Sequence, residues 1–333
     1  VDRTAPTIQV TGVRDGEITR YVPIPVVTFA DTNLARTTLV LDGLAFVSGT
    51  PVAGEGEHRL VASATDLAGN VSSVTVVFTL DTTLPVVTLL GVTDGQCTAA
   101  AVTPIYSAEE LHLSALWATL DGAPFASGTT VEAEGAHELA VTARDVPGNE
   151  AGVLARFTMD RTRPSVVVLG VTDGQMSGTS VSPVVEITDV NLVSSRVLLD
   201  GALFAPGTEV SAEGAHELVA SATDCAGHRT ETTVRFTIDR AAPVVTVSGI
   251  ADGATYASAV TPTVTVSDAH LASQTLTLDG QPFVSGTSIS GEGNHVLVAS
   301  ASDRAGHTST VTIRFTLQAE ASDLFVSAPA AAR

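Results

Sequence analysis

The stretch VTVVFTLD, residues 74–81, alternates apolar and polar positions and returns at a constant spacing. Its apolar side chains fall on one face of an extended chain, which is the pattern of a half-buried β-strand. Three related stretches follow at intervals of 79 residues: VLARFTMD from Val153, TTVRFTID from Thr232 and VTIRFTLQ from Val311. A constant spacing means that one structural unit has been copied in tandem.

Other features keep the same spacing and mark the ends of each unit. One set of Asp-Gly pairs keeps this spacing, beginning at Asp42, Asp121, Asp200 and Asp279. A joining segment of the form DxxxP also recurs, beginning at Asp2, Asp81, Asp160 and Asp239. No fifth joining segment follows Leu317. We therefore predict four repeats and a C-terminal tail or linker, with boundaries at residues 1–80, 81–159, 160–238, 239–317 and 318–333.

The pattern within one repeat predicts an all-β fold. The stretch TTLVLDGLAF, residues 37–46, places an Asp-Gly pair between two apolar runs, and both positions of such a hairpin turn need positive φ. We expect seven short strands in the first repeat, near residues 7–13, 23–30, 36–42, 44–47, 50–53, 58–65 and 71–80. This is the strand count of an immunoglobulin-like sandwich. The predicted architecture is four tandem immunoglobulin-like β-sandwich domains of 79 residues each in an elongated rod.

The charge of the chain excludes two classes of partner. The formal net charge is −20, and arginine supplies all 16 basic residues. A nucleic-acid backbone or an anionic membrane surface repels such a chain. No apolar run approaches the roughly 18 residues of a spanning helix, so we also expect no membrane insertion by this segment. Because the chain begins at Val1, inside a joining segment, we expect it to belong to a longer protein whose other domains are its partners.

Four phrases together carry a resemblance to a known family. They are DxTxP, LDGxxFxxGT, EGxHxLxxxAxDxAGN and FTxD, and they recur over residues 2–317. In combination they resemble the tandem bacterial Ig-like repeats of secreted and cell-surface proteins. The lysine-free, Ala/Val/Thr-rich composition is also similar to very large myxobacterial-type repeat proteins, some of which carry a gliding-motility label. The resemblance implies a β-sandwich in a modular protein that is extracellular or on the bacterial cell surface.

One feature of antibody-type domains does not carry over. In those domains a disulfide joins the two sheets against a buried Trp. Each repeat of this chain holds at most one Cys, and the only Trp is Trp117. The resemblance therefore implies nothing about antigen recognition.

The stretch ATDLAGN, residues 64–70, allows two interpretations. In the first, Asp66 accepts hydrogen bonds from backbone amides of its own turn while Gly69 adopts the left-handed conformation. In the second, this loop, the joining segment and the loop between the second and third strands meet at one end of the sandwich. Each then supplies a carboxylate to a calcium ion, which takes six to eight oxygen ligands.

The candidate calcium ligands form one set per repeat. They are Asp2, Asp31 and Asp66; Asp81, Glu110 and Asp145; Asp160, Asp189 and Asp224; and Asp239, Asp268 and Asp303. We favour the turn interpretation, because the spacing fits no compact calcium loop and His228 and His307 replace the Asn of the first two repeats. We therefore expect no cofactor, with calcium as the open alternative.

One histidine position and one glutamate position also recur in every repeat. We predict that one histidine forms a hydrogen bond at the start of each sixth strand: His58, His137, His216 and His295. The glutamate of the same turn is expected to be solvated: Glu55, Glu134, Glu213 and Glu292. Four copies of a catalytic residue would be redundant, since an active site normally needs one asymmetric cleft. With no nucleophile elbow, phosphate loop or paired Cys-His motif, the sequence predicts no enzyme.

Trp117 and the two cysteines break the repeat pattern. Trp117 should face away from the core, where it either packs against a neighbouring loop or contacts a sugar or protein. Cys97 and Cys225 should lie in loops at the same joint, between the second and third repeats. An extracellular setting permits a disulfide there. Two separate, partly buried thiols are the default expectation, since the loops can lie too far apart.

These features favour a non-enzymatic extracellular spacer or stalk segment of a larger bacterial surface or secreted protein. A proline in every joining segment should resist bending. The alternatives are an adhesive or ligand-binding module for surface polysaccharide or protein, centred on the second repeat, and a subunit of an assembled surface fibre. The fibre would use the C-terminal DLFVS, residues 323–327, as an added strand.

Overall fold

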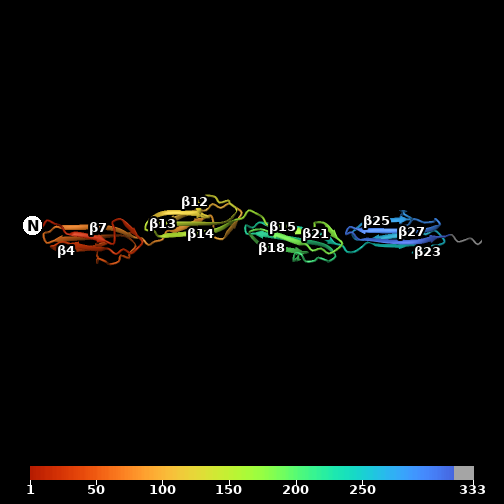
Figure 1. Ribbon diagram of the computed structural model, residues 1–333, viewed down its shortest axis with the longest axis horizontal. Helices are drawn as coiled ribbons and strands as arrows, with labels where there is room; N and C mark the ends of the chain where they lie inside the picture. The colour runs from red at the N-terminus through yellow and green to blue at the C-terminus, as the bar shows by residue number, and fades with distance from the viewer. Residues whose placement is uncertain (319–333) are drawn as a thin grey trace, which may run out of the picture. The chain divides into compact units, whose positions relative to one another are not determined.

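The computed structural model describes residues 1–318, and these residues are all-β. Their contacts divide the chain into two units, Val1–Arg161 and Thr162–Arg333. Each unit holds two sandwiches of the same strand order (Figure 1). The predicted all-β fold of tandem immunoglobulin-like sandwiches is thus confirmed. Almost all of the predicted tail, including DLFVS, lies outside the described residues.

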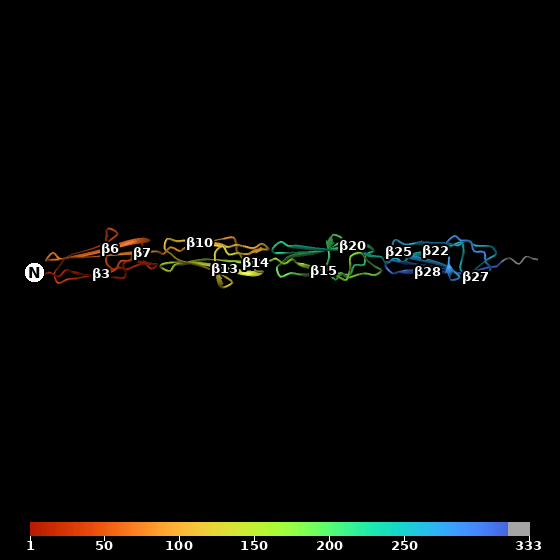
Figure 2. The same ribbon diagram turned by 90° about the horizontal axis from the view of Figure 1, so that it is seen from above.

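The first unit begins with a sandwich of a two-stranded and a five-stranded sheet. The strands of the first repeat are β1 (Thr7–Thr11), β2 (Glu17–Thr19), β3 (Val26–Ala30), β4 (Leu34–Leu41), β5 (Leu44–Ala45), β6 (Gly56–Asp66) and β7 (Val71–Leu80). Strands β1 and β3 pair with each other, and the larger sheet has the order β2-β7-β6-β4-β5. Figure 2 shows β3 in one layer and β6 and β7 in the other.

The second repeat has the same order in its own strands. They are β8 (Val86–Leu90), β9 (Gln96–Thr98), β10 (Ile105–Glu109), β11 (Leu113–Leu120), β12 (Ala123–Phe125), β13 (Gly135–Asp145) and β14 (Glu150–Met159). Strands β8 and β10 form the small sheet, and β12-β11-β13-β14-β9 form the large one. No helix among the described residues is long and apolar enough to cross a membrane.

The second unit repeats this topology twice. The third repeat contains β15 (Ser165–Leu169), β16 (Gln175–Ser177), β17 (Val184–Thr188), β18 (Leu192–Leu199), β19 (Ala202–Leu203), β20 (Gly214–Asp224) and β21 (Arg229–Ile238). The fourth contains β22 (Val244–Ser248), β23 (Ala254–Tyr256), β24 (Thr263–Ser267), β25 (Leu271–Leu278), β26 (Gln281–Pro282), β27 (Gly293–Asp303) and β28 (Thr308–Leu317).

The predicted alternation places the core between the two sheets. In β7, Val76, Phe78 and Leu80 are buried while their neighbours are more exposed. Phe78 packs with residues of both sheets, including Val27 of β3 and Leu60 of β6. Burial of apolar area of this kind is the main stabilising term of such a small domain.

The Asp-Gly hairpin turns have the predicted backbone. Asp42 has φ 51° and Gly43 has φ 83°, and the other three pairs match them. Asp tolerates the left-handed region better than most residues, and Gly adopts it freely. This turn fixes the register of β4 against β5, with Leu41 opposite Leu44.

Two strand predictions were wrong. A three-residue strand, β2, pairs in parallel with the end of β7, and the sequence analysis missed it. Residues 50–53 form no strand: Val52 only donates a backbone hydrogen bond to the Pro23 carbonyl, at 2.9 Å. Proline has no N–H to return the bond. In the second repeat Val102 stands at the equivalent position, and it forms an isolated bridge with Val131.

Candidate functional site

The three loops predicted to meet do so at one end of a sandwich, here called the acidic end. In the first repeat one carboxylate oxygen each from Asp2, Asp31 and Asp66 lies within 4.8 Å of the others. In the fourth repeat Asp239, Asp268 and Asp303 are grouped in the same way. Two of the predicted sets of candidate ligands therefore converge, and each offers the oxygen atoms that calcium prefers.

The second repeat departs from the predicted set. The group there is Asp81, Glu110 and His112, without Asp145. The His112 ring reaches the Asp81 carboxylate, with 2.7 Å between Nδ1 and Oδ2. The sequence analysis missed this histidine, which lies two positions after the rim carboxylate. The signal was present, because the same position holds Asn33 in the first repeat and His270 in the fourth.

Asp145 is not part of this group, and its oxygens accept hydrogen bonds within its own turn. Its Oδ1 accepts the backbone N–H groups of Gly148 at 2.7 Å and Asn149 at 2.6 Å. Its Oδ2 accepts a hydrogen bond from Asn149 Nδ2 at 2.7 Å. The same Nδ2 donates to the Asp81 carbonyl at 2.9 Å, which ties the turn to the joining segment. The turn-capping interpretation is thus confirmed at this position.

Asp66 and its later equivalents are held in the same way. Asp66 accepts both the backbone and the side-chain N–H of Asn70, at 2.8 and 2.7 Å. Asp224 accepts the His228 backbone N–H at 2.8 Å, and its Oδ2 lies 2.8 Å from His228 Nδ1. Burial alone would raise the pKa of Asp224, but these hydrogen bonds outweigh it and the pKa is lowered. Histidine replaces asparagine here as a second donor to the turn aspartate.

The remaining rim carboxylates also accept hydrogen bonds from loop donors. Asp2 Oδ1 accepts the Thr4 backbone N–H at 3.0 Å and its hydroxyl at 2.6 Å, and the hydroxyl bond is the main cause of the lowered pKa of Asp2. Asp31 accepts the Asn33 backbone N–H at 2.7 Å. Asp189 accepts the Asn191 backbone N–H at 2.8 Å, and Asp160 is buried.

In the fourth repeat a histidine connects two of the rim carboxylates. His270 Nδ1 lies 2.7 Å from Asp239 Oδ2, and the His270 backbone N–H donates to Asp268 Oδ1 at 2.7 Å. Asp303 Oδ2 lies 2.9 Å from His307 Nδ1. The carboxylates of the acidic end therefore serve mainly as hydrogen-bond acceptors. A cation would bind through their remaining lone pairs.

Three of the four glutamates predicted to be solvated also hold joining segments. Both carboxylate oxygens of Glu134 lie 3.0 Å from the backbone nitrogen of Arg161, which donates its N–H. Glu213 accepts the Arg240 N–H in the same way, at 3.0 and 3.1 Å. Glu55 accepts the Thr82 N–H. These side chains are exposed, as predicted, and the sequence analysis missed their bonds to the joining segments.

Trp117 lies on the outward face of β11 and is 42% exposed, as its alternation predicted. It borders a recess of about 390 Å³ that Tyr106, Pro124 and Phe125 also line. The Tyr106 hydroxyl donates to the Phe125 carbonyl at 2.8 Å, which fixes the wall of the recess. An exposed indole beside an apolar hollow is suited to contact with a flat ligand face. The contact itself remains a prediction.

The two cysteines lie in different units. Cys97 lies in β9 of the first unit, and Cys225 lies in the loop after β20 of the second. Both are partly buried. A disulfide between them is one of the two alternatives of the sequence analysis, and it stays an expectation there.

No family model matches this chain, and no curated protein matches it. Several solved structures share its general architecture. Fibronectin(III)-like modules of CbhA from Clostridium thermocellum are 15% identical with a TM-score of 0.26, over 46% of this chain and 94% of theirs. Sidekick-1 immunoglobulin domains 1–5 are 10% identical with a TM-score of 0.35, over 94% of this chain and 81% of theirs.

A third structure is a Ca²⁺-stabilized adhesin that helps an Antarctic bacterium reach out and bind ice. It is 19% identical with a TM-score of 0.27, over 95% of this chain and 100% of that chain. At such TM-scores the superpositions transfer no residue role. The assignment of the fold therefore rests on the strand order and pairing described above.

Proposed function

We propose that this chain is a non-enzymatic spacer segment of a larger bacterial surface or secreted protein. One observation carries the proposal: the carboxylate and amide side chains that recur in each repeat form hydrogen bonds to turns and joining segments. Asp145 caps its own turn, Asn149 connects that turn to the joining segment, and Glu134 holds the next joining segment. In such a domain the polar side chains hold the turns and joining segments at its ends. This suits a domain that keeps its neighbours in the chain apart.

The repetition supports the same conclusion. The fastening of the joining segment by a glutamate occurs in the first, second and third repeats, at Glu55, Glu134 and Glu213. A binding or catalytic site normally occupies one asymmetric cleft, whereas a spacer gains from every additional identical unit. We place the segment outside the cell or on the bacterial surface, on the sequence resemblance, with the other domains of the longer chain as its partners. The similarity to repeat proteins that carry a gliding-motility label rests on composition alone.

Proteolysis of the joining segments tests the fastening directly. Glu55, Glu134 and Glu213 are changed together to Gln in the full chain, which weakens the charge-assisted bonds to the joining-segment amides. We expect cleavage within these segments to become several-fold faster. A control replaces three other exposed glutamates by Gln: Glu57, Glu132 and Glu209. Equal cleavage rates in the two variants would contradict the proposed role.

A second candidate function is adhesion through the second repeat. The specific observation is the exposed Trp117 beside the Tyr106 recess, since the other repeats carry Thr38, Arg196 or Thr275 at this position. Trp117 is the only Trp of the chain, so its fluorescence reports binding without a label. Titration with bacterial surface polysaccharide should shift the emission of the native chain. The Trp117→Thr variant, assayed by pull-down, should lose that binding. Equal binding of the polysaccharide by the native chain and the variant would contradict adhesion through Trp117, and only the spacer function would then stand.

Calcium at the acidic ends is a third proposal, subordinate to the first. It is supported by the grouping of three carboxylates in the first and fourth repeats. A bound cation would link a joining segment to two loops and so reduce its motion. It would be an accessory to the spacer rather than a separate activity.

A further inference from the structure

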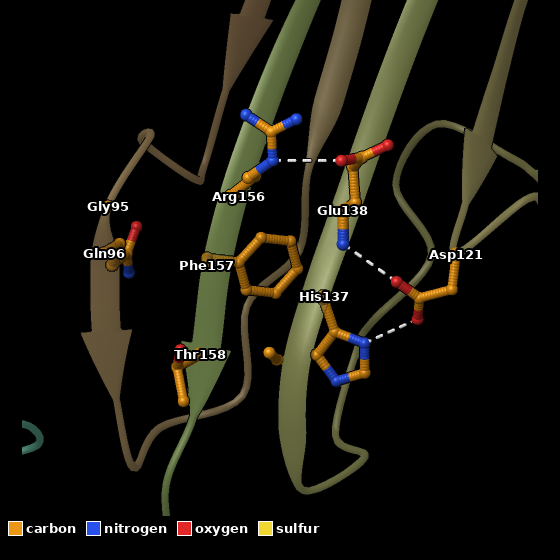
Figure 3. A pocket seen from close by; sticks show the side chains of 9 residues that line it. Gly95, Gln96, Asp121, His137, Glu138, Arg156, Phe157 and Thr158 are labelled. Carbon is orange, nitrogen blue, oxygen red and sulfur yellow. Dashed lines mark hydrogen bonds and ion pairs between the residues drawn. The ribbon is translucent and has the colours of Figure 1, made fainter. Parts of the chain in front are cut away.

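A histidine in each repeat faces two oxygen acceptors at once. In the second repeat His137 Nδ1 lies 2.7 Å from Asp121 Oδ2 (Figure 3). Its Nε2 lies 2.9 Å from the Ala133 carbonyl oxygen. The other three copies have the same contacts, with distances of 2.7 to 2.9 Å, at His58, His216 and His295. The arrangement of histidine, hairpin aspartate and loop carbonyl is here called the clasp.

The chemistry of the clasp favours a protonated ring. An ionised carboxylate and a backbone carbonyl can only accept hydrogen bonds. A neutral imidazole has one N–H and can satisfy only one of them, whereas an imidazolium has two N–H groups and satisfies both. Asp121 is oriented for this role because its other oxygen, Oδ1, accepts the Glu138 backbone N–H at 2.8 Å.

A carboxylate, an aromatic ring and an ion pair lie around the His137 ring. Asp121 faces it from the hairpin turn, and Phe157 of β14 lies against it, with ring centroids 5.4 Å apart. Glu138 and Arg156 line the adjoining recess of about 340 Å³, and their side chains form an ion pair at 3.0 Å (Figure 3). The recess has no unpaired charge among these residues, so Asp121 is the group that acts most directly on the ring.

The clasp is connected to the joining segment through one short loop. His137 holds this loop at the Ala133 carbonyl, and the next residue, Glu134, accepts the Arg161 N–H at 3.0 Å. The first and third repeats have the same chain of contacts, through Gly54 and Glu55 and through Ala212 and Glu213. The contact of the histidine and the fastening of the joining segment therefore lie on adjacent residues of one loop.

We propose that the clasp is a pH-sensitive latch: the protonated histidine fixes the loop and its glutamate on the joining segment, and loss of the proton loosens both. This goes beyond the spacer function, because it makes the fastening of the joining segment depend on the acidity of the surroundings.

The direction of the effect follows from the two titrating groups. Burial lowers the pKa of His137, but the hydrogen bonds to Ala133 and Asp121 outweigh it and the pKa lies above its ordinary 6.5. Burial raises the pKa of Asp121, but the bonds from Glu138 and His137 bring it below its ordinary 3.8. The stabilisation by histidine is complete below pH 6.5 and is lost as the pH rises through the folded pKa. The stabilisation by aspartate is lost only below pH 3.8, so the latch is fully closed between these limits.

The experiment uses the full chain with isotope-labelled histidine. Long-range ¹H–¹⁵N spectra between pH 5 and 9 report the protonation of each ring, and His137→Gln assigns one of them. In the native chain His137 should carry two N–H groups at pH 6.5, and its titration should coincide with a fall in the amide-exchange protection of Arg161. Asp121→Asn should lower the pKa of His137 and move the loss of protection to lower pH.

The matched control is Asp200→Asn in the third repeat, which should affect His216 and leave His137 and Arg161 unchanged. A His137 ring that is neutral at pH 6 would overturn the proposal. Constant protection of the Arg161 amide across the titration would overturn it equally, because the ring would then be uncoupled from the joining segment. The titration of the native chain requires no variant to fold, so a poorly folded Asp121→Asn protein would not remove the test.

Discussion

Asp145→Ala provides the sharpest test of the turn-capping interpretation. The aspartate is 1% exposed and accepts three hydrogen bonds, from the Gly148 N–H, the Asn149 N–H and the Asn149 side chain. Alanine removes the acceptor for all three, and the tight turn between β13 and β14 leaves little room for water. The substitution therefore leaves N–H donors without an acceptor and removes no apolar contact.

The magnitude follows from the number of donors left without a partner. A buried donor without an acceptor costs about 1–3 kcal/mol. The Asn149 side chain retains its bond to the Asp81 carbonyl, so we count the two backbone amides fully and the side chain in part. The expected loss in the free energy of unfolding of the second repeat is about 3–6 kcal/mol. Small domains have about 5–15 kcal/mol in total, so this repeat should be close to unfolding.

The assay uses the only tryptophan, because Trp117 lies in the second repeat and reports its unfolding alone. Urea titration of the native and variant chains, followed by Trp117 fluorescence, gives the change in midpoint and slope. Glu150→Ala is the control: it removes the same charge at the first residue of β14, next to the same turn, but its ion pair with Arg144 is more than half exposed and should contribute under about 1 kcal/mol. A loss below about 1 kcal/mol for Asp145→Ala would refute the reasoning.

Three further predictions follow from the described residues. Gly91→Ala should cost more than about 2 kcal/mol, because φ is +82° and a Cβ would lie 2.5 Å from the Thr103 carbonyl oxygen; Gly95→Ala, with φ +78° and open space, should cost only about 1–2 kcal/mol in the same denaturation assay. Millimolar calcium should raise the melting temperature and a chelator should lower it, by ligand linkage at the acidic ends, whereas an unchanged curve would leave only the hydrogen-bonded corner. The Cys97–Cys225 disulfide that the sequence analysis left open, worth about 4–5 kcal/mol in the chain-entropy model, would appear as a linked peptide pair in non-reducing mapping, and two alkylated thiols would exclude it.

The features of the fold that depend on local sequence were predictable. The Asp42-Gly43 pair fixed the hairpin, since few residues tolerate two successive positive φ angles. The period of two in β7 predicted which side chains are buried. The strand β2 was not predictable in this way, because three residues carry no periodicity and their pairing with β7 is parallel and distant in sequence.

The candidate site was predictable as a place but not atom by atom. Strand order alone brings the joining segment and two loops together, so the convergence of Asp2, Asp31 and Asp66 could be expected. Which side chain completes a group depends on reach and on local donors. In the second repeat His112 contacts Asp81 and stands in the group where the sequence analysis expected Asp145, and strand order does not predict that exchange. The sequence analysis predicted a hydrogen bond of His137 but not its partner. The contact joins the start of β13 to Asp121, in the hairpin turn between β11 and β12.

Small-angle X-ray scattering of the full chain tests the spacer function most directly. The longest strand of a repeat has 11 residues, and at about 3.3 Å per residue, with its loops, it gives a repeat of roughly 40 Å. Four repeats whose joining segments are fastened by Glu55, Glu134 and Glu213 should give an elongated monomer with a maximum dimension on the order of 160 Å. A compact particle of less than about half that dimension would contradict the proposal, because repeats that fold back on one another cannot act as a spacer.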